Sequence, residues 1–353
     1  MGIRKLLRSS SFVSSLYYGL HLDELPAALS LRSYMHSVEV AIKKYMPEAT
    51  DQEREQAKSD IRHCYLKYKI SPTEYFLFDF QKLSPDERAS YLSDKMIYMT
   101  AGKVIDRKLH DEQLENKYNF YQLTQKYFKR KAILIKSDND WSLFKDFSTE
   151  FCDFIIKPNT SGCGSGIRVE HVSNESEAKT VFNQMIHSGN QWIVEELIRQ
   201  SDDMASWNPS SVNTVRISSF LNRKGFFIIC PFIRTGRKGS VVDNGGKGGL
   251  YAAIDEKTGR IITDGKDEMC GVYSEHPDSH VVYKGWQIPE WDELLKLADE
   301  IHQLFPKHKY IAWDFAHTDN GWVLVEGNWG EFIAQQSTME RGYKKEFMDL
   351  ILG

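Results

Sequence analysis

The N-terminal part of the chain repeats apolar residues at helical spacing. Residues 31–46 place them three or four positions apart, which predicts one amphipathic helix. Ser-Pro pairs open the segments 71–80 and 84–99, and acidic residues follow within the first turn, as at many helix starts. Residues 115–132 show helical spacing once more. We therefore predict a helical region over residues 1–110 and one further helix after it.

After about residue 130 the pattern changes to short apolar runs rich in β-branched and aromatic residues, which is typical of strands. Two pairs of runs are joined by residues 222–225 and 318–321, where Asn or Gly supplies the positive φ of a hairpin turn. Residues 291–305 return to helical spacing. The pattern predicts an α+β fold with antiparallel hairpins. The runs lie at residues 132–135, 154–157, 192–198, 214–220, 226–233, 310–317 and 322–328.

The composition is that of a globular protein. Of the 353 residues, 41% are apolar and 27% are charged, which suits a sizeable core. The net charge of -4 argues against a nucleic-acid partner, because such a partner requires a basic surface. The 5 cysteines are odd in number and lack metal-binding spacing, so we expect free thiols in a reducing cytoplasm.

The apolar runs are all too short for a membrane span, which takes about 18 apolar residues. Residues 1–20 are basic and then mildly apolar, and no cleavage site of small residues follows, so we expect no signal peptide. Two interpretations of this segment remain open. It is either a basic helix that rests on a membrane surface or an ordinary helix that packs on the protein.

Residues 154–168, FIIKPNTSGCGSGIR, join a strand-like run to a glycine-rich loop. Glycines let successive backbone N–H groups approach an anion such as phosphate. Lys157 shares a strand face with Ile155, so its ammonium group can add a point charge beside that loop. The spacing fits neither a P-loop nor a dinucleotide fingerprint. The alternatives are a flexible surface turn and an edge lysine that opposes aggregation.

The hairpin of residues 310–328 carries acidic residues between apolar neighbours. Strand alternation places Asp314, Glu326 and Asn328 on one side of the sheet. Carboxylate and amide oxygens are hard ligands, and Mg²⁺ takes one or two carboxylates together with substrate phosphates. The alternative is a pair of surface acids on a solvated sheet face. The sequence therefore predicts a magnesium site, and an ordinary polar surface is the alternative interpretation of the same residues.

Two more strand-like runs carry polar residues. Arg216 shares a face with Thr214 and Ser218, and an arginine beside phosphates neutralises developing charge. Glu195 and Glu196 point to opposite faces of their run. A strand and linker with such a carboxylate can hold the adenine and ribose of a nucleotide.

Taken in chain order, these groups resemble an ATP-grasp enzyme between Lys117 and Asn328. Residues 210–220, 233–249, 283–291 and 310–328 resemble more specifically the sugar-transfer-associated ATP-grasp family, and the helical lead-in extends the resemblance over most of the chain. The groups that match the superfamily are Lys117, Lys157 with its glycine loop, Glu195–Ile198, Asp314, and Glu326-Gly-Asn328.

The resemblance implies an ATP-grasp fold of two α+β lobes, at residues 111–200 and 201–353, that bind ATP and Mg²⁺. Asp314, Glu326 and Asn328 would hold the metal. Many family members have an arginine two residues after the asparagine, where this chain has Gly330. That departure leaves Arg216 or Arg234 to stabilise the transferred phosphate, with Arg234 and Lys284 as candidates to bind an anionic substrate. The implied nucleotide-binding residues are Lys117, Lys157, Ser161, Gly162, Gly164, Ser165, Gly166, Glu195, Glu196, Leu197, Ile198 and Asp203.

Residues 236–249 form a second glycine-rich segment, with five glycines between residues 239 and 249. We expect a mobile lid that excludes water from a reactive phosphate. The alternative is a disordered surface loop. Four of its side chains are candidates to touch the acceptor: Arg237, Asp243, Asn244 and Lys247.

The resemblance implies a cytoplasmic ligase that activates a carboxylate as an acyl phosphate and joins it to an amine. The family name points to polysaccharide and other cell-surface glycan biosynthesis. A kinase that phosphorylates a hydroxyl of a small molecule or sugar would use the same ATP and Mg²⁺ groups, so that alternative stays open. A non-catalytic nucleotide-binding protein is the third hypothesis. The acid, the acceptor and the oligomeric state are not predicted.

Overall fold

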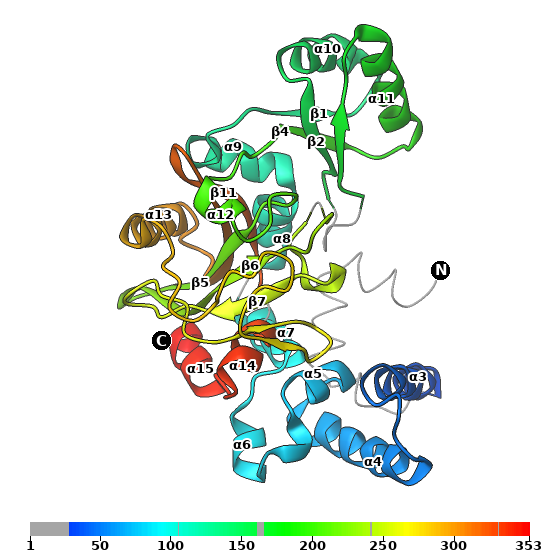
Figure 1. Cartoon of the computed structure of the whole chain (residues 1–353). Helices are drawn as coiled ribbons and strands as arrows, with labels where there is room; N and C mark the ends of the chain where they lie inside the picture. The colour runs from blue at the N-terminus through cyan, green and yellow to red at the C-terminus, as the bar shows by residue number, and fades with distance from the viewer. Residues whose placement is uncertain (1–27, 105, 161–165, 241, 331) are drawn as a thin grey trace.

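The computed structural model of the chain describes residues 28–104, 106–160, 166–240, 242–330 and 332–353 (Figure 1). The basic N-terminal segment and four of the glycine-loop candidates, Ser161, Gly162, Gly164 and Ser165, lie outside these residues. Within the described residues, every helix is too short or too polar to cross a lipid bilayer. The structure is a mixed α+β fold with antiparallel sheets, which confirms the predicted fold class.

The described part of the N-terminal region is helical, as predicted. It consists of α3 (Ala28–Tyr45), α4 (Asp51–Tyr68), α5 (Pro72–Leu77), the 3-10 turn η1 (Phe80–Lys82), α6 (Pro85–Ser90) and α7 (Asp94–Val104). Ser71 and Ser84 each close a capping box with a glutamate three residues on, and a proline follows each serine at the first helical position. These local signals explain why α5 and α6 begin where the sequence predicted.

The predicted single helix over residues 84–99 is wrong, because the structure divides it into α6 and α7. Tyr91 is extended, and its side chain and that of Leu92 are buried. The side chain of Gln336 accepts a hydrogen bond from the Leu92 N–H at 2.8 Å and donates to the Leu92 carbonyl at 2.7 Å. This distant contact satisfies the backbone and so replaces helical hydrogen bonds between α6 and α7.

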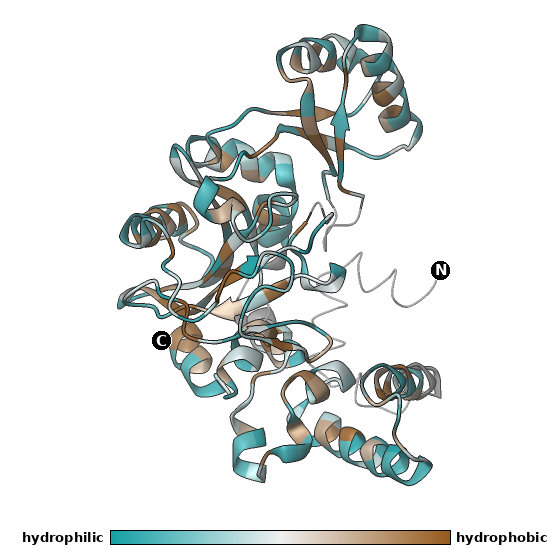
Figure 2. Ribbon diagram, in the orientation of Figure 1, coloured by the Kyte–Doolittle hydropathy of each residue, from teal (hydrophilic) through white to brown (hydrophobic). Residues whose placement is uncertain are grey.

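A small antiparallel sheet forms the upper part of Figure 1. Its strands follow the order β1 (Ala132–Ile135), β4 (Trp192–Glu196), β2 (Asp153–Pro158) and β3 (Arg168–His171). Helices α10 (Trp141–Glu150) and α11 (Glu175–His187) pack on the sheet, through a core that contains Phe144, Phe154 and Phe182. Figure 2 shows hydrophobic residues concentrated on these strands, while hydrophilic residues cover the outer turns of the two helices.

The larger sheet has seven strands in the order β11-β10-β5-β6-β7-β8-β9. The hairpin turns at residues 222–225 and 318–321 are confirmed, since Asn222 pairs with Gly225 and Thr318 pairs with Gly321. The strands are β5 (Thr214–Asn222), β6 (Gly225–Thr235), β7 (Leu250–Ala253), β8 (Gly265–Lys266), β9 (Val272–Tyr273), β10 (Tyr310–Thr318) and β11 (Gly321–Asn328).

Helices cover both faces of the large sheet. On one face, α9 (Lys117–Phe128) and α13 (Trp291–Gln303) share a core with Trp313 and Phe315. On the other face, α14 (Ile333–Met339) and α15 (Lys344–Leu352) pack against a core that includes Ala312. Side chains alternate along a strand, so Asp314 shares its face with Ala312. The other described elements are short: α8 (Arg107–His110), the π-helical turn η2 (Asp111–Glu115), the 3-10 turns η3 (Asp138–Asp140) and η4 (Gly245–Lys247), and α12 (Asp202–Ala205).

Candidate functional site

A cavity of about 1120 Å³ opens between the two sheets. The small sheet contributes residues of β2 and β4, and the large sheet contributes residues of β5, β6, β10 and β11. Helix α7 of the N-terminal region and helix α14 also line it. The cavity brings together these predicted site residues: Lys117, Lys157, Glu195, Glu196, Leu197, Ile198, Arg216, Arg234, Asp314, Glu326 and Asn328.

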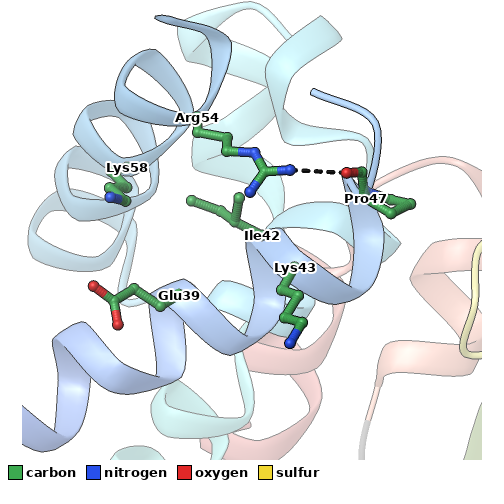
Figure 3. Close-up of a pocket in the computed structure, with 6 residues that line it drawn as sticks. All are labelled: Glu39, Ile42, Lys43, Pro47, Arg54 and Lys58. Atoms are coloured by element: carbon green, nitrogen blue, oxygen red, sulfur yellow. Dashed lines mark hydrogen bonds between the residues drawn. The ribbon is translucent and has the colours of Figure 1, made fainter. Parts of the chain in front are cut away.

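A second, smaller hollow of about 550 Å³ lies between α3 and α4 (Figure 3). Arg54 there donates to the Pro47 carbonyl at 2.8 Å and to the Ala49 carbonyl at 2.9 Å. Lys58 pairs with Glu55 at 2.7 Å. Arg54 and Lys58 are therefore engaged within the helical region, and the predicted site residues named above line the larger cavity instead.

Lys157 and Glu195 form an ion pair at one wall of the cavity. The Lys157 Nζ lies 3.1 Å from a Glu195 carboxylate oxygen, because β2 and β4 are adjacent and in register. Arg130 also donates to Glu195, from Nη2 at 2.8 Å and from Nε at 3.1 Å. Burial by itself raises the pKa of Glu195, but the charges of Lys157 and Arg130 outweigh it and lower that pKa to about 2. The wall therefore holds a permanent carboxylate between two cations.

Lys117 is the first residue of α9 and lines the cavity beside Lys157. Its burial lowers its pKa, and the nearby Lys157 charge acts in the same direction. Asn159 fixes the start of this helix, because its carbonyl accepts from the Lys117 N–H at 3.0 Å and its side-chain oxygen accepts from the Tyr118 N–H at 2.9 Å. Asn159 directly follows β2, so it ties the ends of the two lysine-bearing elements together.

Two arginines and two aspartates form a buried network on the large sheet. Arg216 and Asp314 pair across β5 and β10, with guanidinium nitrogens 2.6 Å from each carboxylate oxygen. Arg234 on β6 bridges Asp314 at 2.8 Å and Asp243 at 2.7 Å. Asp243 also accepts from the backbone N–H of Thr214 at 3.1 Å and from the Thr214 hydroxyl.

The two aspartates of this network differ in acidity. Burial raises the pKa of both carboxyl groups. At Asp314, the charges of Arg216 and then Arg234 outweigh burial and lower the pKa to about 2. At Asp243, burial prevails over Arg234 and the pKa stays raised. Asp314 is therefore the more acidic of the two aspartates.

The predicted metal ligands meet on β10 and β11. Asp314 and Glu326 are direct cross-strand partners, and the ladder shifts register after Asp314. Asn328 donates from its side-chain nitrogen to Glu326 at 3.0 Å, which holds the two side chains together. Two carboxylates and an amide oxygen match the hard ligands of Mg²⁺, so this donor set fits the ion. Among the described residues, no cluster of three or more His, Cys, Asp or Glu side chains offers another metal site.

Other predicted residues lie elsewhere. Lys284 pairs with Asp264 at 2.8 Å and is not among the lining residues of the cavity. Asp203 is exposed in the short helix α12. Gly166 ends the glycine loop with a φ of 76°, a conformation that favours glycine. These positions stay predictions.

The segment of residues 236–249 reaches the cavity with Asp243, Asn244 and Lys247. Arg237 instead pairs with Asp278 at 2.7 Å, outside the cavity. Asp243 anchors the segment to β5 and β6 through Thr214 and Arg234. The predicted lid is thus attached to the sheet at a buried carboxylate.

Sequence reasoning missed Arg130, Asn159 and two aromatic residues of the cavity wall. Arg130 stands in the run Lys129-Arg130-Lys131, which reads as an exposed basic stretch, yet its side chain is 4% exposed. The only sequence signal at Asn159 is the Pro-Asn pair after Lys157. Such a pair predicts a turn and does not predict hydrogen bonds to the start of a helix. The aromatic residues, Tyr98 and Trp329, carried no signal in the pattern.

Comparison with known proteins gives a family match. A family model described as sugar-transfer associated ATP-grasp matches residues 101–344. A search among curated proteins found no match. Three solved structures are similar in part. They are D-alanyl-alanine synthetase A from Vibrio cholerae, D-alanine–D-alanine ligase from Helicobacter pylori and phosphoribosylamine–glycine ligase from Thermotoga maritima.

Identity to these structures is low and the matches are partial. The Vibrio protein is 13% identical with a TM-score of 0.44, and the match covers 69% of this chain and 65% of that one. The Helicobacter protein is 16% identical with a TM-score of 0.41, over 68% and 58%. The Thermotoga protein is 12% identical with a TM-score of 0.41, over 63% and 49%. The chain therefore spans less than two thirds of each.

Proposed function

The chain belongs to the sugar-transfer associated ATP-grasp family, and on that premise we propose that it is an ATP- and Mg²⁺-dependent carboxylate–amine ligase. One observation carries the proposal. A single cavity sets Lys117 and Lys157 beside one sheet and the acid set of Asp314, Glu326 and Asn328 on the other. Cations on one side and hard oxygen ligands on the other suit a metal-bound polyphosphate.

The nucleotide would lie along the small sheet. Lys157 and Lys117 would contact its phosphates, and the glycine loop after β2 would cover them. The adenine and ribose would lie beside the end of β4, where Glu196, Leu197 and Ile198 line the cavity. Because Glu195 is held by Lys157 and Arg130, its role here is to orient the Lys157 ammonium group rather than to meet the ribose directly.

Asp314, Glu326 and Asn328 would hold Mg²⁺, which neutralises phosphate charge when bound. The substrate carboxylate oxygen forms a bond to the γ-phosphorus as the bond to the β–γ bridging oxygen breaks, which yields an acyl phosphate and ADP. The amine nitrogen then attacks the acyl carbon, loses a proton, and inorganic phosphate leaves. Arg216 and Arg234 supply the positive charge beside the anionic reactants.

The proposal has two finer parts, one drawn from the family description and one from the need for ATP. We place the substrates in polysaccharide or other cell-surface glycan biosynthesis, and we place the enzyme in the cytoplasm, where ATP is plentiful. Small-molecule or glycan-linked acids and amines would be its partners. Neither part is needed for the chemical test.

Phosphorus NMR of the full chain with Mg-ATP tests the reaction type. The protein is incubated with pools of carboxylates, amines and sugars, and each pool is omitted in turn. We expect ADP and free phosphate only when an acid and an amine are both present. A new stable phosphate ester without free phosphate would instead identify a kinase. Failure to bind Mg-ATP at all would refute both enzymatic alternatives.

A further inference from the structure

Two stacked aromatic rings line the same cavity as the predicted metal ligands. Tyr98 of α7 and Trp329, which directly follows Asn328, are stacked with ring centroids 5.7 Å apart and planes inclined by 18°. Both residues line the cavity. The N-terminal helical region and the large sheet thus contribute one ring each to the same wall.

Neighbouring residues hold both rings in place. His110 contacts Trp329 edge-on, with centroids 4.9 Å apart and an angle of 70°. At the start of α7, Glu74 accepts from the Asp94 N–H at 2.8 Å, and Gln336 holds Leu92 just before it. Tyr98 nevertheless remains 51% exposed. A rigid, half-exposed aromatic ring on a cavity wall offers a flat apolar surface to a ligand.

A carboxylate accompanies the rings. Asp94 lies four residues before Tyr98, on the same face of α7, and it also lines the cavity. Arg216 and Arg234 line the same cavity on the side of the metal ligands. A ligand in this cavity can therefore meet an apolar face, a hydrogen-bond acceptor and a pair of cations.

The size of the cavity leaves space for such a ligand beside a nucleotide. Sites for a single ligand usually measure roughly 300–1000 Å³. This cavity, at about 1120 Å³, exceeds that range. Its lining is also varied, since it includes two lysines, residues of β4 and the aromatic pair.

We propose that Tyr98 and Trp329 form the seat of a pyranose ring, and that the acid substrate is a uronic acid or a glycan ending in one. This inference rests on the proposed function, which it deepens. A pyranose presents a face of C–H bonds that packs on an aromatic ring, and a rim of hydroxyl groups that donate to a carboxylate such as Asp94. Its own carboxylate is the group that Arg216 and Arg234 would receive.

A purine or other heterocycle fits this wall less well, because it lacks the several hydroxyl donors that the Asp94 carboxylate can accept. A short aliphatic acid fits less well because it has no flat face to cover the exposed Tyr98 ring. The ring pair, the carboxylate and the cations together favour a sugar acid.

Saturation-transfer NMR on the full chain with a non-hydrolysable Mg-ATP analogue tests the seat. The probes are methyl glucuronide and methyl galacturonide, and glutarate is the acid without a ring. We expect transfer to the C–H protons of at least one uronide in the wild type. We expect Tyr98→Ala to weaken its affinity about tenfold or more, and Tyr98→Phe to stay within about threefold, because stacking is lost only in the first.

The readout separates this inference from the function on which it rests. Affinity for the nucleotide analogue is measured in the same samples, and we expect it unchanged in both variants. If the analogue binds and neither uronide does, or if glutarate binds as tightly as the uronides, the sugar seat is refuted while the ligase proposal stands. Equal uronide affinity in Tyr98→Ala and wild type also refutes it. Failure of the analogue to bind refutes the proposed function itself.

Discussion

Arg216 and Asp314 face each other across β5 and β10, with two guanidinium nitrogens 2.6 Å from the two carboxylate oxygens. Arg234 adds a third contact to the same carboxylate at 2.8 Å. The acid that we assign to Mg²⁺ is thus already neutralised by arginines. When Mg-ATP binds, Asp314 would exchange its arginine partners for the metal. The two arginines would at the same time exchange Asp314 for phosphate.

The first prediction concerns the stability of this network. Asp314→Asn leaves two partly buried guanidinium groups facing a neutral amide in place of the buried carboxylate, and removing one partner of a buried ion pair costs about 3–5 kcal/mol. We expect the free energy of unfolding, measured by urea denaturation, to fall by an amount in that range. Glu150→Gln is the control, because Glu150 and its partner Lys131 form an exposed ion pair, and we expect it within about 0.5 kcal/mol of wild type. Equal free energies of unfolding for both variants would contradict the assigned importance of the Arg216–Asp314 pair.

The second prediction concerns metal-dependent turnover. Glu326→Ala removes a proposed Mg²⁺ ligand whose hydrogen-bond partner is the side chain of Asn328. We expect Mg²⁺-dependent release of phosphate from ATP to fall by about 100-fold or more, since such ligands carry several kcal/mol of charge stabilisation. Circular dichroism should show an intact fold. A variant that keeps its activity would show that the metal assignment is wrong.

The third prediction concerns ATP affinity. Lys157→Ala removes a cation that lies within hydrogen-bonding distance of Glu195 and lines the cavity. We expect ATP to bind about tenfold more weakly, or worse, by calorimetry, because one charge-assisted contact to phosphate is lost. Lys131→Ala is the control, since that lysine pairs with Glu150 and is not among the cavity-lining residues. Unchanged affinity in Lys157→Ala would rule out the phosphate role.

The fourth prediction concerns acid stability. The pKa of Glu195 and that of Asp314 are lowered to about 2, below the unfolded values of about 4. Their stabilising contribution is therefore complete above pH 4 and is lost as the pH falls toward 2. We expect the thermal midpoint to fall through this window. Glu195→Gln lacks one titrating group and should show a shallower fall, whereas an identical slope would contradict the pairing of Glu195.

The fifth prediction concerns the glycine-rich segment. A Cβ at Gly249 would collide with the backbone carbonyl of Asp243, whereas a Cβ at Gly246 would come no closer than 3.5 Å to any neighbour. We expect Gly249→Ala to displace Asp243 from Arg234 and to lower stability by about 1–3 kcal/mol. Gly246→Ala should be near neutral. Similar unfolding curves for the two variants would show that the backbone accommodates the added methyl group without displacing Asp243.

The sequence predicted the elements that depend on local pattern. Hairpin turns, capped helix starts and alternating strands are set by nearby residues, and the structure has them where expected. The break between α6 and α7 was missed because it depends on Gln336, a residue far along the chain. Tertiary contacts of this kind leave no periodic signal.

Candidate site residues could be predicted where strand alternation places them on one face of a sheet. Asp314 and Glu326 are cross-strand neighbours because alternation and one hairpin bring them together. Arg130 was not predictable, because a buried cation in a basic run looks like a solvated one until its carboxylate partner is known. Lys284 shows the reverse, since its acceptor Asp264 occupies it outside the cavity.

The hydrogen bonds between Gln336 and Leu92 also affect where the chain can be truncated. The family match begins at residue 101, which suggests a fragment that starts there. Such a fragment would lose the Leu92 carbonyl and leave the buried Nε2 of Gln336 without the acceptor that it has at 2.7 Å. An unsatisfied buried donor costs about 1–3 kcal/mol. A fragment meant to keep this contact must therefore begin before Leu92, upstream of the point where the family match begins.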